Sequence, residues 1–536
     1  MIKLALYCFL CGLCVALWSI ANAGEQFENG KALYFDGKRN NGKNLTARVA
    51  GGAVLQGKLA ACVRCHRPSG YGVNESDART ADITADTLFK PLKPRRDYLL
   101  RSLYQERHGV IAQLNAKTPR SRPAYRHKAD ILKALRKGID TGGNTLSTLM
   151  PRYDIDLDDA TALRAFLQTL GNKPTPGVDA QTLHFATVVN KSNSERKQTM
   201  LAVMHAFIEL HNREVEREKS RNDFSPLFKG EWVHARRIWK LHVWTLPDNR
   251  DHWPALLNKY YSEQPVFALL SGQITGAWKP IHDFCEDTKL PCLFPLTDWP
   301  ETKPGQYTLY LSHGLPGEVK LIADKLNAIH AHEVLQVIGS DPNAELAAYL
   351  LEKDIKKSDI SIKTIHLTEY MNGNNDTRQN DSVILWFNAN NFKQLSNSGI
   401  KTPSTATFAA GSLLADGYRR LPKQLPQNLN LSWQYSTPGH EPPRLYRLRG
   451  WLAARQINTH EETTALNTYL ALDAVRHALV HLVDRYSRNY LIESIEHEIE
   501  NALNPGTYPR LSLGPGQRFA AKDARLSPIR AGFGMH

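Results

Sequence analysis

The chain has 536 residues, of which 42% are hydrophobic and 22% charged, and these globular values exclude long-range disorder and collagen-like repeats. At roughly 150 residues a domain, the length predicts two to four domains. The formal net charge of +14 favours anionic partners, such as an acidic protein face or a membrane surface. No dense Lys/Arg run with interleaved aromatic side chains is present, so nucleic acid is not an expected partner.

Residues 1–23 are typical of an export signal. Lys3 gives a short positive start, residues 4–20 are apolar, and Ala21-Asn22-Ala23 forms a small-x-small cleavage site. The alternative is an uncleaved membrane anchor, for which this apolar run is at the short limit. We expect cleavage, a periplasmic location and no membrane span in the mature protein.

The first chemical motif is Cys62-Val63-Arg64-Cys65-His66, which has the C-x-x-C-H spacing of c-type haem attachment. Two thiols one helical turn apart can each form a thioether with a haem vinyl group, and the following His can bind the iron. A thioredoxin-like motif would need a βαβ surrounding, and a zinc knuckle would need two further ligands. The motif therefore predicts one covalent haem c, attached to Cys62 and Cys65, with His66 as the proximal iron ligand.

A low-spin iron needs a sixth ligand, for which Met150 is the favoured candidate. Pro151 follows it and fixes the backbone in a loop, which suits a thioether held against iron. The other interpretation of Met150 is a buried core side chain. His108 and His127 are rival ligands that would give a bis-His centre.

Two amphipathic helices are expected in this part of the chain, at Phe27 to Phe35 and from Leu157 to about Leu170. With the haem motif between them, residues 24–172 resemble the class I cytochrome c family. The resemblance implies an all-α domain in which the two helices pack together. Residues 82–122 are rich in Lys and Arg, and two interpretations stay open: a solvated insertion, or a basic rim that steers an acidic redox partner.

A Pro- and Gly-containing stretch at residues 173–181 indicates a linker, and residues 182–536 follow an α/β pattern. The expected strands are 183–189, 240–244, 266–271, 292–295, 308–312, 334–338 and 383–387, and the expected helices are 198–216, 253–261, 277–287, 317–329 and 344–353. This alternation predicts mostly parallel sheets covered on both faces, with ligands bound beyond the carboxyl ends of the strands. No phosphate-binding loop, nucleophile elbow or H-E-x-x-H occurs, so we expect no enzyme, haem-based catalysis alone being left open.

Residues 265–272, 277–287 and 290–295 resemble the type I periplasmic binding protein family, and residues 472–475 and 508–518 fit the same family. Taken whole, the chain resembles bacterial fusions of a cytochrome c to an ABC-transporter-type substrate-binding domain. The resemblance implies a two-lobed α/β domain that closes on amino acids and similar small solutes.

The family grips its ligand with hydroxyl groups and backbone amides on loops of the first lobe. Carried over by position, these residues are Ser271, Gly272, Gln273, Thr297 and Asp298, for which polar turn residues are the competing interpretation. The loop at residues 190–193 lacks the glycines that many relatives place there. A receptor that has lost its solute and serves as a docking module is therefore an open alternative.

Cys285 and Cys292 lie seven residues apart around an expected helix-to-strand turn. In an oxidising compartment this spacing favours a short-loop disulfide, with two free buried thiols as the alternative.

Two functions compete. The preferred hypothesis is electron transfer by a periplasmic c-type cytochrome carrying one haem and meeting an acidic redox partner. The alternative is a receptor for a small, amino-acid-like solute, for transport or sensing, in which the haem is an accessory.

Overall fold

The computed structural model describes most of the chain beyond residue 22, and the described ranges are 23–75, 78–92, 121–171, 174–192, 194–221, 236–303, 305–355, 359–372, 381–400, 406–426, 428–435, 443–457, 460–482, 485–500, 507–522 and 524–529. Except for Ala23, the expected export signal lies outside these ranges. The chain divides into two compact units, Met1–Pro174 and Thr175–His536, so the division falls within residues 173–181.

The first unit is a small α+β domain. Its helices are residues 23–36, α2 (Val63–His66), α3 (Ala85–Leu88), α5 (Lys128–Lys137) and α6 (Leu157–Leu167). Its strands are β1 (Thr46–Arg48), β2 (Val54–Gln56) and β5 (Arg152–Asp154), paired antiparallel in the order β2-β1-β5, and the pair β3 (Asn74–Glu75) and β4 (Ala78–Arg79). The expectation of an all-α domain is therefore wrong here: short strands with exposed residues leave no apolar run for sequence analysis to detect.

The core of this unit joins its first helix to α6. The ring of Phe166 lies 5.0 Å from the ring of Tyr34 and 5.8 Å from that of Phe27, centroid to centroid. Gly30 permits this approach, because a Cβ atom at this position would lie 2.0 Å from the carbonyl oxygen of Ala162. The two helices thus cross with their backbones in close contact.

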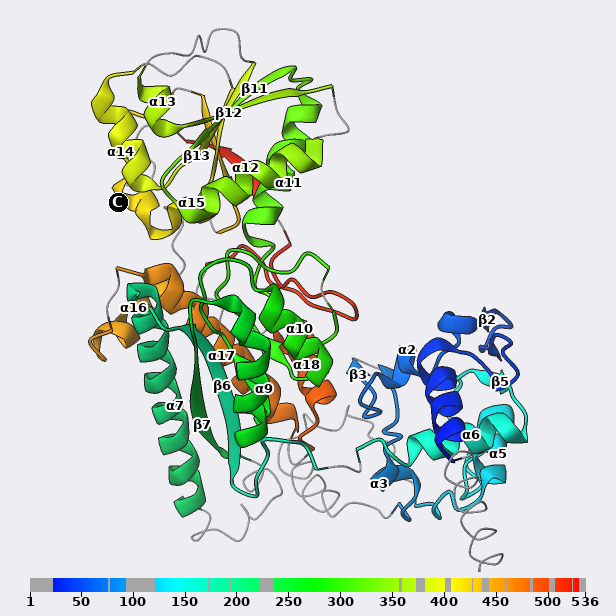
Figure 1. The fold of residues 1–536 in the computed structure, drawn as a ribbon. Coiled ribbons are helices and arrows are strands. Elements are labelled where there is room, and N and C mark those ends of the chain that lie inside the picture. Colours follow the sequence, from blue (N-terminus) through cyan, green and yellow to red (C-terminus); the bar gives the residue numbers. More distant parts are fainter. Residues whose placement is uncertain are drawn as a thin grey trace, which may run out of the picture. The chain divides into compact units, whose positions relative to one another are not determined.

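The second unit begins with a five-stranded parallel sheet in the order β10-β9-β8-β6-β7, of which β6 and β7 are labelled in Figure 1. Its strands are β6 (Thr182–Asn190), β7 (Ile238–Leu246), β8 (Ala268–Leu270), β9 (Cys292–Leu293) and β10 (Thr308–Leu309). Numbered along the chain this is the order 2-1-3-4-5, in which the winding direction reverses between β6 and β8. We call this sheet with its helices lobe 1.

Helices cover both faces of the first sheet. Buried side chains of α7 (Glu195–Arg221), α17 (Glu462–Leu482) and α18 (Arg488–Glu498) form a core with one face. Side chains of α9 (Trp253–Glu263) and α10 (Lys279–Thr288) form a core with the other. Along β6, Phe185 contributes to the first core and Ala186 to the second, as the alternation of side chains along a strand requires.

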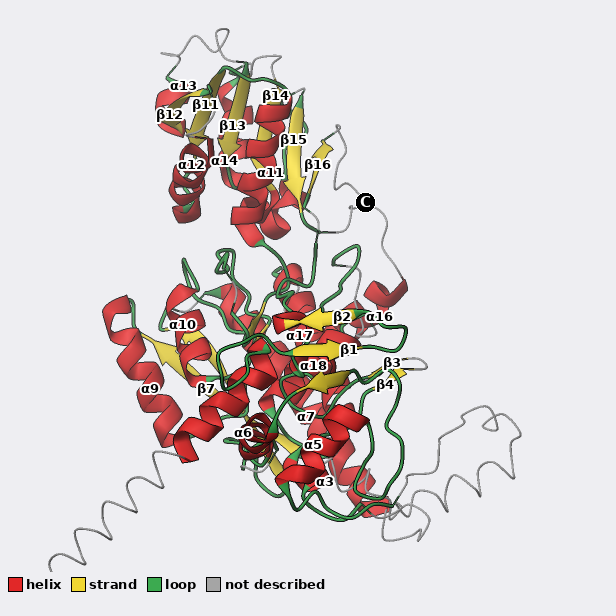
Figure 2. Ribbon diagram, turned by 90° about the vertical axis from the view of Figure 1, so that its right-hand side faces the viewer, coloured by secondary structure: helices red, strands yellow, loops and turns green. Residues whose placement is uncertain are grey.

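Lobe 2 repeats the arrangement. Its sheet has the order β12-β11-β13-β14-β15-β16, with β16 alone antiparallel (Figure 2). The strands are β11 (Glu333–Ile338), β12 (Ser361–His366), β13 (Ser382–Trp386), β14 (Ala406–Ala410), β15 (Leu429–Trp433) and β16 (Arg525–Pro528). Helices α11 (Gly314–Ala328) and α12 (Pro342–Ile355) pack on one face, and α13 (Leu367–Met371) and α14 (Ala389–Ser398) on the other.

The chain passes from one lobe to the other at three places in the second unit. It leaves lobe 1 after β10, returns after β15 through α16 (Pro443–Ala453), and enters lobe 2 again to form β16. The short helix α15 (Gly411–Leu414) follows β14 in lobe 2. A two-lobed α/β unit with three connections is thus established by the topology of the two sheets.

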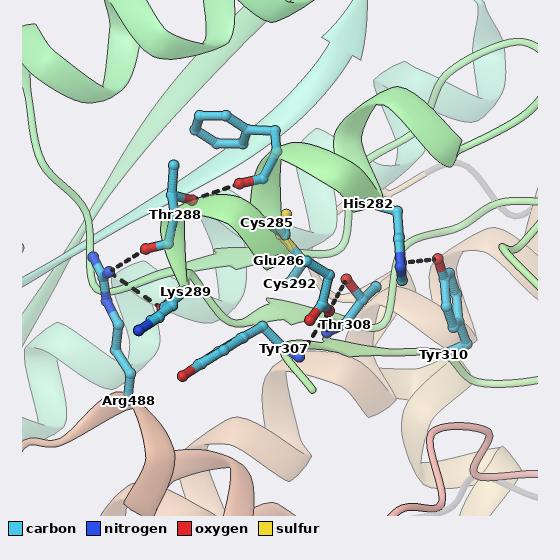
Figure 3. Close-up of a disulfide and its surroundings, with 11 residues drawn as sticks. His282, Cys285, Glu286, Thr288, Lys289, Cys292, Tyr307, Thr308, Tyr310 and Arg488 are labelled. Atoms are coloured by element: carbon cyan, nitrogen blue, oxygen red, sulfur yellow. Dashed lines mark hydrogen bonds between the residues drawn. A yellow bond between two sulfur atoms is a disulfide. The ribbon is translucent and has the colours of Figure 1, made fainter. Parts of the chain in front are cut away.

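A disulfide joins α10 to β9 in lobe 1 (Figure 3). The Cα atoms of Cys285 and Cys292 are 6.2 Å apart and both side chains are fully buried. Beside it, the carboxylate of Glu286 accepts hydrogen bonds from the backbone N–H groups of Gln306 (2.7 Å), Tyr307 (2.8 Å) and Thr308 (3.0 Å). These bonds fix the segment that leads into β10.

We expect a reducing agent to lower the free energy of unfolding of the wild-type protein by about 2 kcal/mol, because the short loop then regains its freedom in the unfolded chain. Urea unfolding followed by tryptophan fluorescence measures this difference. The Cys285→Ala/Cys292→Ala variant is the control, and its unfolding should not respond to the reducing agent. An equal response in both proteins would contradict the prediction.

Candidate functional site

A polar pocket lies beyond the carboxyl ends of strands in lobe 1. Its volume is about 340 Å³, counting the space open to solvent. Residues 295–298, which follow β9, and residues 310–312, which follow β10, form much of its wall. The remaining lining residues are Arg196, Gln434, Tyr435, Asn467 and Tyr508. Gln434 and Tyr435 follow β15, so segments that leave both sheets meet at this pocket.

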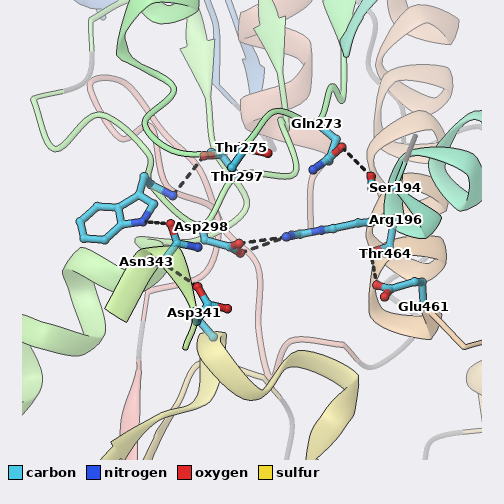
Figure 4. A network of polar contacts seen from close by, with 12 residues as sticks. Ser194, Arg196, Gln273, Thr275, Thr297, Asp298, Asp341, Asn343, Glu461 and Thr464 are labelled. Carbon is cyan, nitrogen blue, oxygen red and sulfur yellow. Dashed lines mark hydrogen bonds and ion pairs between the residues drawn. The ribbon is translucent and has the colours of Figure 1, made fainter. Parts of the chain in front are cut away.

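An ion pair joins Arg196 and Asp298 in the pocket wall (Figure 4). The Arg196 Nη1 and Nη2 atoms donate to the two carboxylate oxygens of Asp298 at 2.9 and 3.3 Å. Each side chain keeps some exposure, 33% for Arg196 and 24% for Asp298. The negative charge of Asp298 raises the pKa of Arg196, so the guanidinium group stays charged.

Arg196 is held by the loop between β6 and α7. The Ser194 hydroxyl accepts a hydrogen bond from the backbone N–H of Lys197 at 3.1 Å. It also donates a hydrogen bond to the Gln273 side chain at 3.4 Å (Figure 4). The side chain of Asn190 accepts a hydrogen bond of 2.6 Å from the backbone N–H of Thr275. The loops after β6 and β8 are thus tied together at the point where the winding of the sheet reverses.

Asp298 is held from the side of lobe 2. Its carbonyl oxygen accepts a hydrogen bond of 2.9 Å from the N–H of Leu315, at the start of α11. Gly314 has a φ of +57°, and a Cβ atom there would lie 2.5 Å from the Asp298 carbonyl oxygen, so only glycine fits without strain. The neighbouring Trp299 donates its indole N–H to the Asn343 side chain of lobe 2 at 2.8 Å.

Two further carboxyl groups act on Arg196 electrostatically. They are Asp341, which accepts a hydrogen bond from the Asn343 N–H, and Glu461, which accepts one from the Thr464 hydroxyl. Burial raises the pKa of both groups, and the charge of Arg196 opposes the shift in each case. The region around the pocket therefore combines one guanidinium group with three carboxyl groups (Figure 4).

Tyrosine hydroxyl groups supply the remaining polarity. Burial raises the pKa of Tyr435 and of Tyr508, so both hydroxyl groups keep their protons at neutral pH. The two rings lie 5.4 Å apart, and the side-chain amide of Asn467 donates to the Tyr508 hydroxyl at 3.3 Å. The pocket can therefore both donate and accept hydrogen bonds.

The five ligand-binding residues expected from the sequence separate into two groups. Thr297 and Asp298 line the pocket. Ser271, Gly272 and Gln273 do not, although all three lie in the loop after β8. Ser271 is 2% exposed and its N–H donates to the Leu293 carbonyl group, so it is committed to the sheet. Gln273 does not line the pocket, but its side chain accepts a hydrogen bond from Ser194, two residues before Arg196.

Sequence analysis missed Arg196, Gln434, Tyr435, Asn467 and Tyr508 as site residues. Arg196 had a usable signal, since it follows the first strand at the end where ligands of parallel sheets bind. Tyr508 stands in the tail that carried part of the family resemblance. Gln434, Tyr435 and Asn467 reach the pocket only through the folding of distant segments.

The C-x-x-C-H residues lie in the first unit. Cys62 is buried, which raises its pKa to about 12, and Cys65 is exposed. His66 ends α2, and its Nδ1 atom lies 2.9 Å from the carbonyl oxygen of Ala81. Met150 is partly buried against the core of this unit. His127 is exposed at the start of α5, whereas His108 and most of the basic stretch lie outside the described residues.

Comparisons with known proteins give structural similarity only. No protein-family model matches the chain, and no curated protein matches it. Among solved structures, a substrate-binding periplasmic protein from Ralstonia solanacearum matches with 11% identity over 66% of this chain and 98% of its own, with a TM-score of 0.47. A branched-chain amino acid ABC transporter protein from Thermus thermophilus with bound valine matches with 11% identity over 66% of this chain and 95% of its own, with a TM-score of 0.47. A leucine-binding protein from Thermotoga maritima matches with 10% identity over 65% of this chain and 96% of its own, with a TM-score of 0.44.

The donor groups of the described residues contradict the prediction of a covalent haem c. Within the described ranges, no group of three or more His, Cys, Asp or Glu side chains is arranged to hold a metal ion. The prediction of haem as the cofactor, which depended on the spacing of a short motif, is corrected accordingly.

In the described part of the chain, none of the helices has both the length and the apolarity needed to cross a bilayer.

We expect Gly314→Ala to lower the stability of the second unit by more than Gly399→Ala does. Both glycines have positive φ angles, +57° and +70°, so each substitution costs about 1–2 kcal/mol of backbone strain. A Cβ atom at Gly399 meets nothing within 4 Å, whereas one at Gly314 meets the Asp298 carbonyl oxygen. Urea unfolding of the two variants measures the difference, and equal losses would contradict the close contact.

Proposed function

We propose that the chain is a periplasmic receptor that captures a small polar solute in the pocket between its two lobes. The single observation that carries this proposal is the Arg196–Asp298 ion pair in the wall of an open polar pocket. Charged groups that remain partly exposed in a concave site can exchange their partner for a ligand. The pocket also lies beyond the carboxyl ends of parallel strands, where ligands of such sheets bind.

The charges of the pocket favour an amino-acid-like solute. Arg196 is the group that would hold a carboxylate in a bidentate contact, and Asp298 is the group that would hold an ammonium group. When such a solute binds, the ion pair between Arg196 and Asp298 is replaced by two new pairs, one between Arg196 and the solute carboxylate and one between Asp298 and its ammonium group. Asp341 and Glu461 add negative potential, which disfavours a solute that carries only a carboxylate. Hydroxyl groups of Ser312, Tyr435 and Tyr508 would then bind polar atoms of the same molecule.

The two-lobed construction supplies the movement that capture requires. Two lobes joined at a few chain crossings can rotate as bodies about those crossings and close on a ligand. Trp299 of lobe 1 already bonds to Asn343 of lobe 2, so contacts exist that closure could strengthen. We propose that the loaded receptor serves a membrane transporter. Electron transfer is not retained, because it required the haem.

We expect L-amino acids to raise the melting temperature of the protein, since a ligand that binds only the folded state stabilises it. A thermal-shift screen of the amino acids gives the best binder. Calorimetry then compares this amino acid with its two analogues that lack only the amino group or only the carboxyl group. Both analogues should bind at least roughly tenfold more weakly, because each leaves one charge of the ion pair without a new partner. Equal binding of the analogue without an amino group would contradict the role of Asp298.

We expect Asp298→Asn to weaken binding of the same amino acid by roughly tenfold to a hundredfold, the loss of a charged hydrogen bond. Asp283→Asn is the matched control, because Asp283 lies in the same lobe and pairs with exposed Lys279 on the surface of α10. The control should bind as the wild type does. Unchanged affinity of the Asp298→Asn protein would exclude this pocket as the solute site.

A further inference from the structure

A fully buried carboxyl group lies in lobe 2 next to the pocket. Glu318, on α11, has no exposed surface. It is in contact with two serines: Ser412 donates to it through both its backbone N–H (3.1 Å) and its hydroxyl group (3.0 Å), and the Ser432 hydroxyl lies 3.3 Å from Oε2. In the described part of the chain no cationic side chain pairs with Glu318, which is unusual for a buried carboxyl group.

This cluster connects directly to the pocket wall. The side-chain amide of Gln434 donates to the Ser412 hydroxyl oxygen at 2.9 Å, and Gln434 lines the pocket. Gln434 also contacts the hydroxyl group of Tyr435, another lining residue, at 3.4 Å. A continuous chain of hydrogen bonds therefore runs from Glu318 through Ser412 to the pocket, and nearly all of its atoms are buried.

The hydrogen atoms in this cluster balance best when Glu318 is neutral. The Ser432 hydroxyl lies near two acceptors, Glu318 Oε2 at 3.3 Å and the Ala409 carbonyl oxygen at 3.2 Å, but it has one hydrogen. A protonated Glu318 can donate to Ser432, which then donates to Ala409. An ionised Glu318 leaves one of the two contacts without a hydrogen, in a site that water does not reach.

The charged groups around Glu318 also favour the neutral form. Burial raises its pKa to about 8 from the ordinary value of 4.5, and the charge of Asp298 acts in the same direction. The elements α15, β14 and β15 that pack against α11 carry no ionisable side chain. The ionisable groups on the other neighbouring elements, and on α11 itself, are Glu345, Tyr349, Glu352, Lys353 and Asp354 of α12, Arg525 of β16, and Lys320, Asp324 and Lys325 of α11.

We propose that Glu318 is a positioning residue of the solute pocket: its neutral carboxyl group fixes Ser412, which holds the side-chain amide of Gln434 in the pocket wall. This proposal rests on the proposed function, because it assigns a role within the same pocket. Ionisation of Glu318 removes its hydrogen bond to Ser432 and makes its carboxylate a stronger acceptor for Ser412, so the contacts of both serines change and Gln434, which is bonded to Ser412, moves with them. Placement of Gln434, and with it the shape of the pocket, becomes dependent on pH.

The first test compares the melting temperatures of the wild type and Glu318→Gln across the pH range. Folded wild-type protein holds the Glu318 proton up to about pH 8, whereas the unfolded chain loses it near 4.5, so its stability falls as pH rises between these values. Glutamine cannot ionise, and its amide can donate to Ser432 as the neutral acid does. The advantage of Glu318→Gln should grow through this window, and a constant difference would overturn the proposal. Glu352→Gln, in the same lobe, is the control and should show no such growth.

The second test follows Gln434 itself and needs neither a solute nor the Glu318→Gln variant. In wild-type protein labelled with ¹⁵N-glutamine, the side-chain signal of Gln434, identified by its loss in Gln434→Ala, should shift with a midpoint near pH 8. The signal of Gln336, which bonds to Trp386 elsewhere in lobe 2, serves as the reference. A Gln434 signal that stays fixed while Glu318 ionises would leave Glu318 a purely structural role. Because no solute is used, a failure to bind amino acids would count against the proposed function and not against this result.

Discussion

The ion pair between Arg196 and Asp298 is the interaction on which the functional part of the structure depends. Arg196 stands at the start of α7, beyond the end of the first strand, and Asp298 stands beyond the end of β9. An ion pair between them draws together two loops that parallel strands present at the same edge. Asp298 is in turn fixed by the start of α11, so the pair also marks the place where lobe 1 meets lobe 2. Because the pair is partly exposed, it contributes little to the stability of the fold.

Much of the α/β fold could be predicted from the sequence, because buried parallel strands are continuous apolar runs and long helices are periodic. The strands at residues 183–189 and 334–338 and the helix at residues 253–261 lie within β6, β11 and α9. Strand β12 was missed because it lies at an edge and has only two apolar residues, Ile362 and Ile365, which do not alternate with the polar ones. β16 was missed because four residues, two of them Arg525 and Pro528, carry no strand signal.

The site was predictable only where position along the chain was enough. Thr297 and Asp298 follow a buried strand, and the rule for parallel sheets placed them correctly at the pocket. Ser271 also follows a buried strand, but it is buried in the sheet and does not reach the pocket. The rule therefore predicts at which edge of the sheet the site lies, but not which residues line it. The C-x-x-C-H motif shows the opposite weakness: the spacing of five residues led to the prediction of a complete cofactor, but the described residues contain no group of three or more His, Cys, Asp or Glu side chains that could hold a metal ion.

The order of the strands has a consequence for how the chain acquires its structure. Lobe 1 needs α17 and α18 to cover one face of its sheet, and lobe 2 needs β16 to form one edge of its sheet. Both contributions come from the last part of the chain, so a nascent polypeptide emerging from the ribosome cannot complete either lobe early. A product truncated before α17 lacks part of the cover on one face of the lobe 1 sheet and the edge strand β16 of the lobe 2 sheet, so it exposes apolar surface and unpaired backbone to proteases.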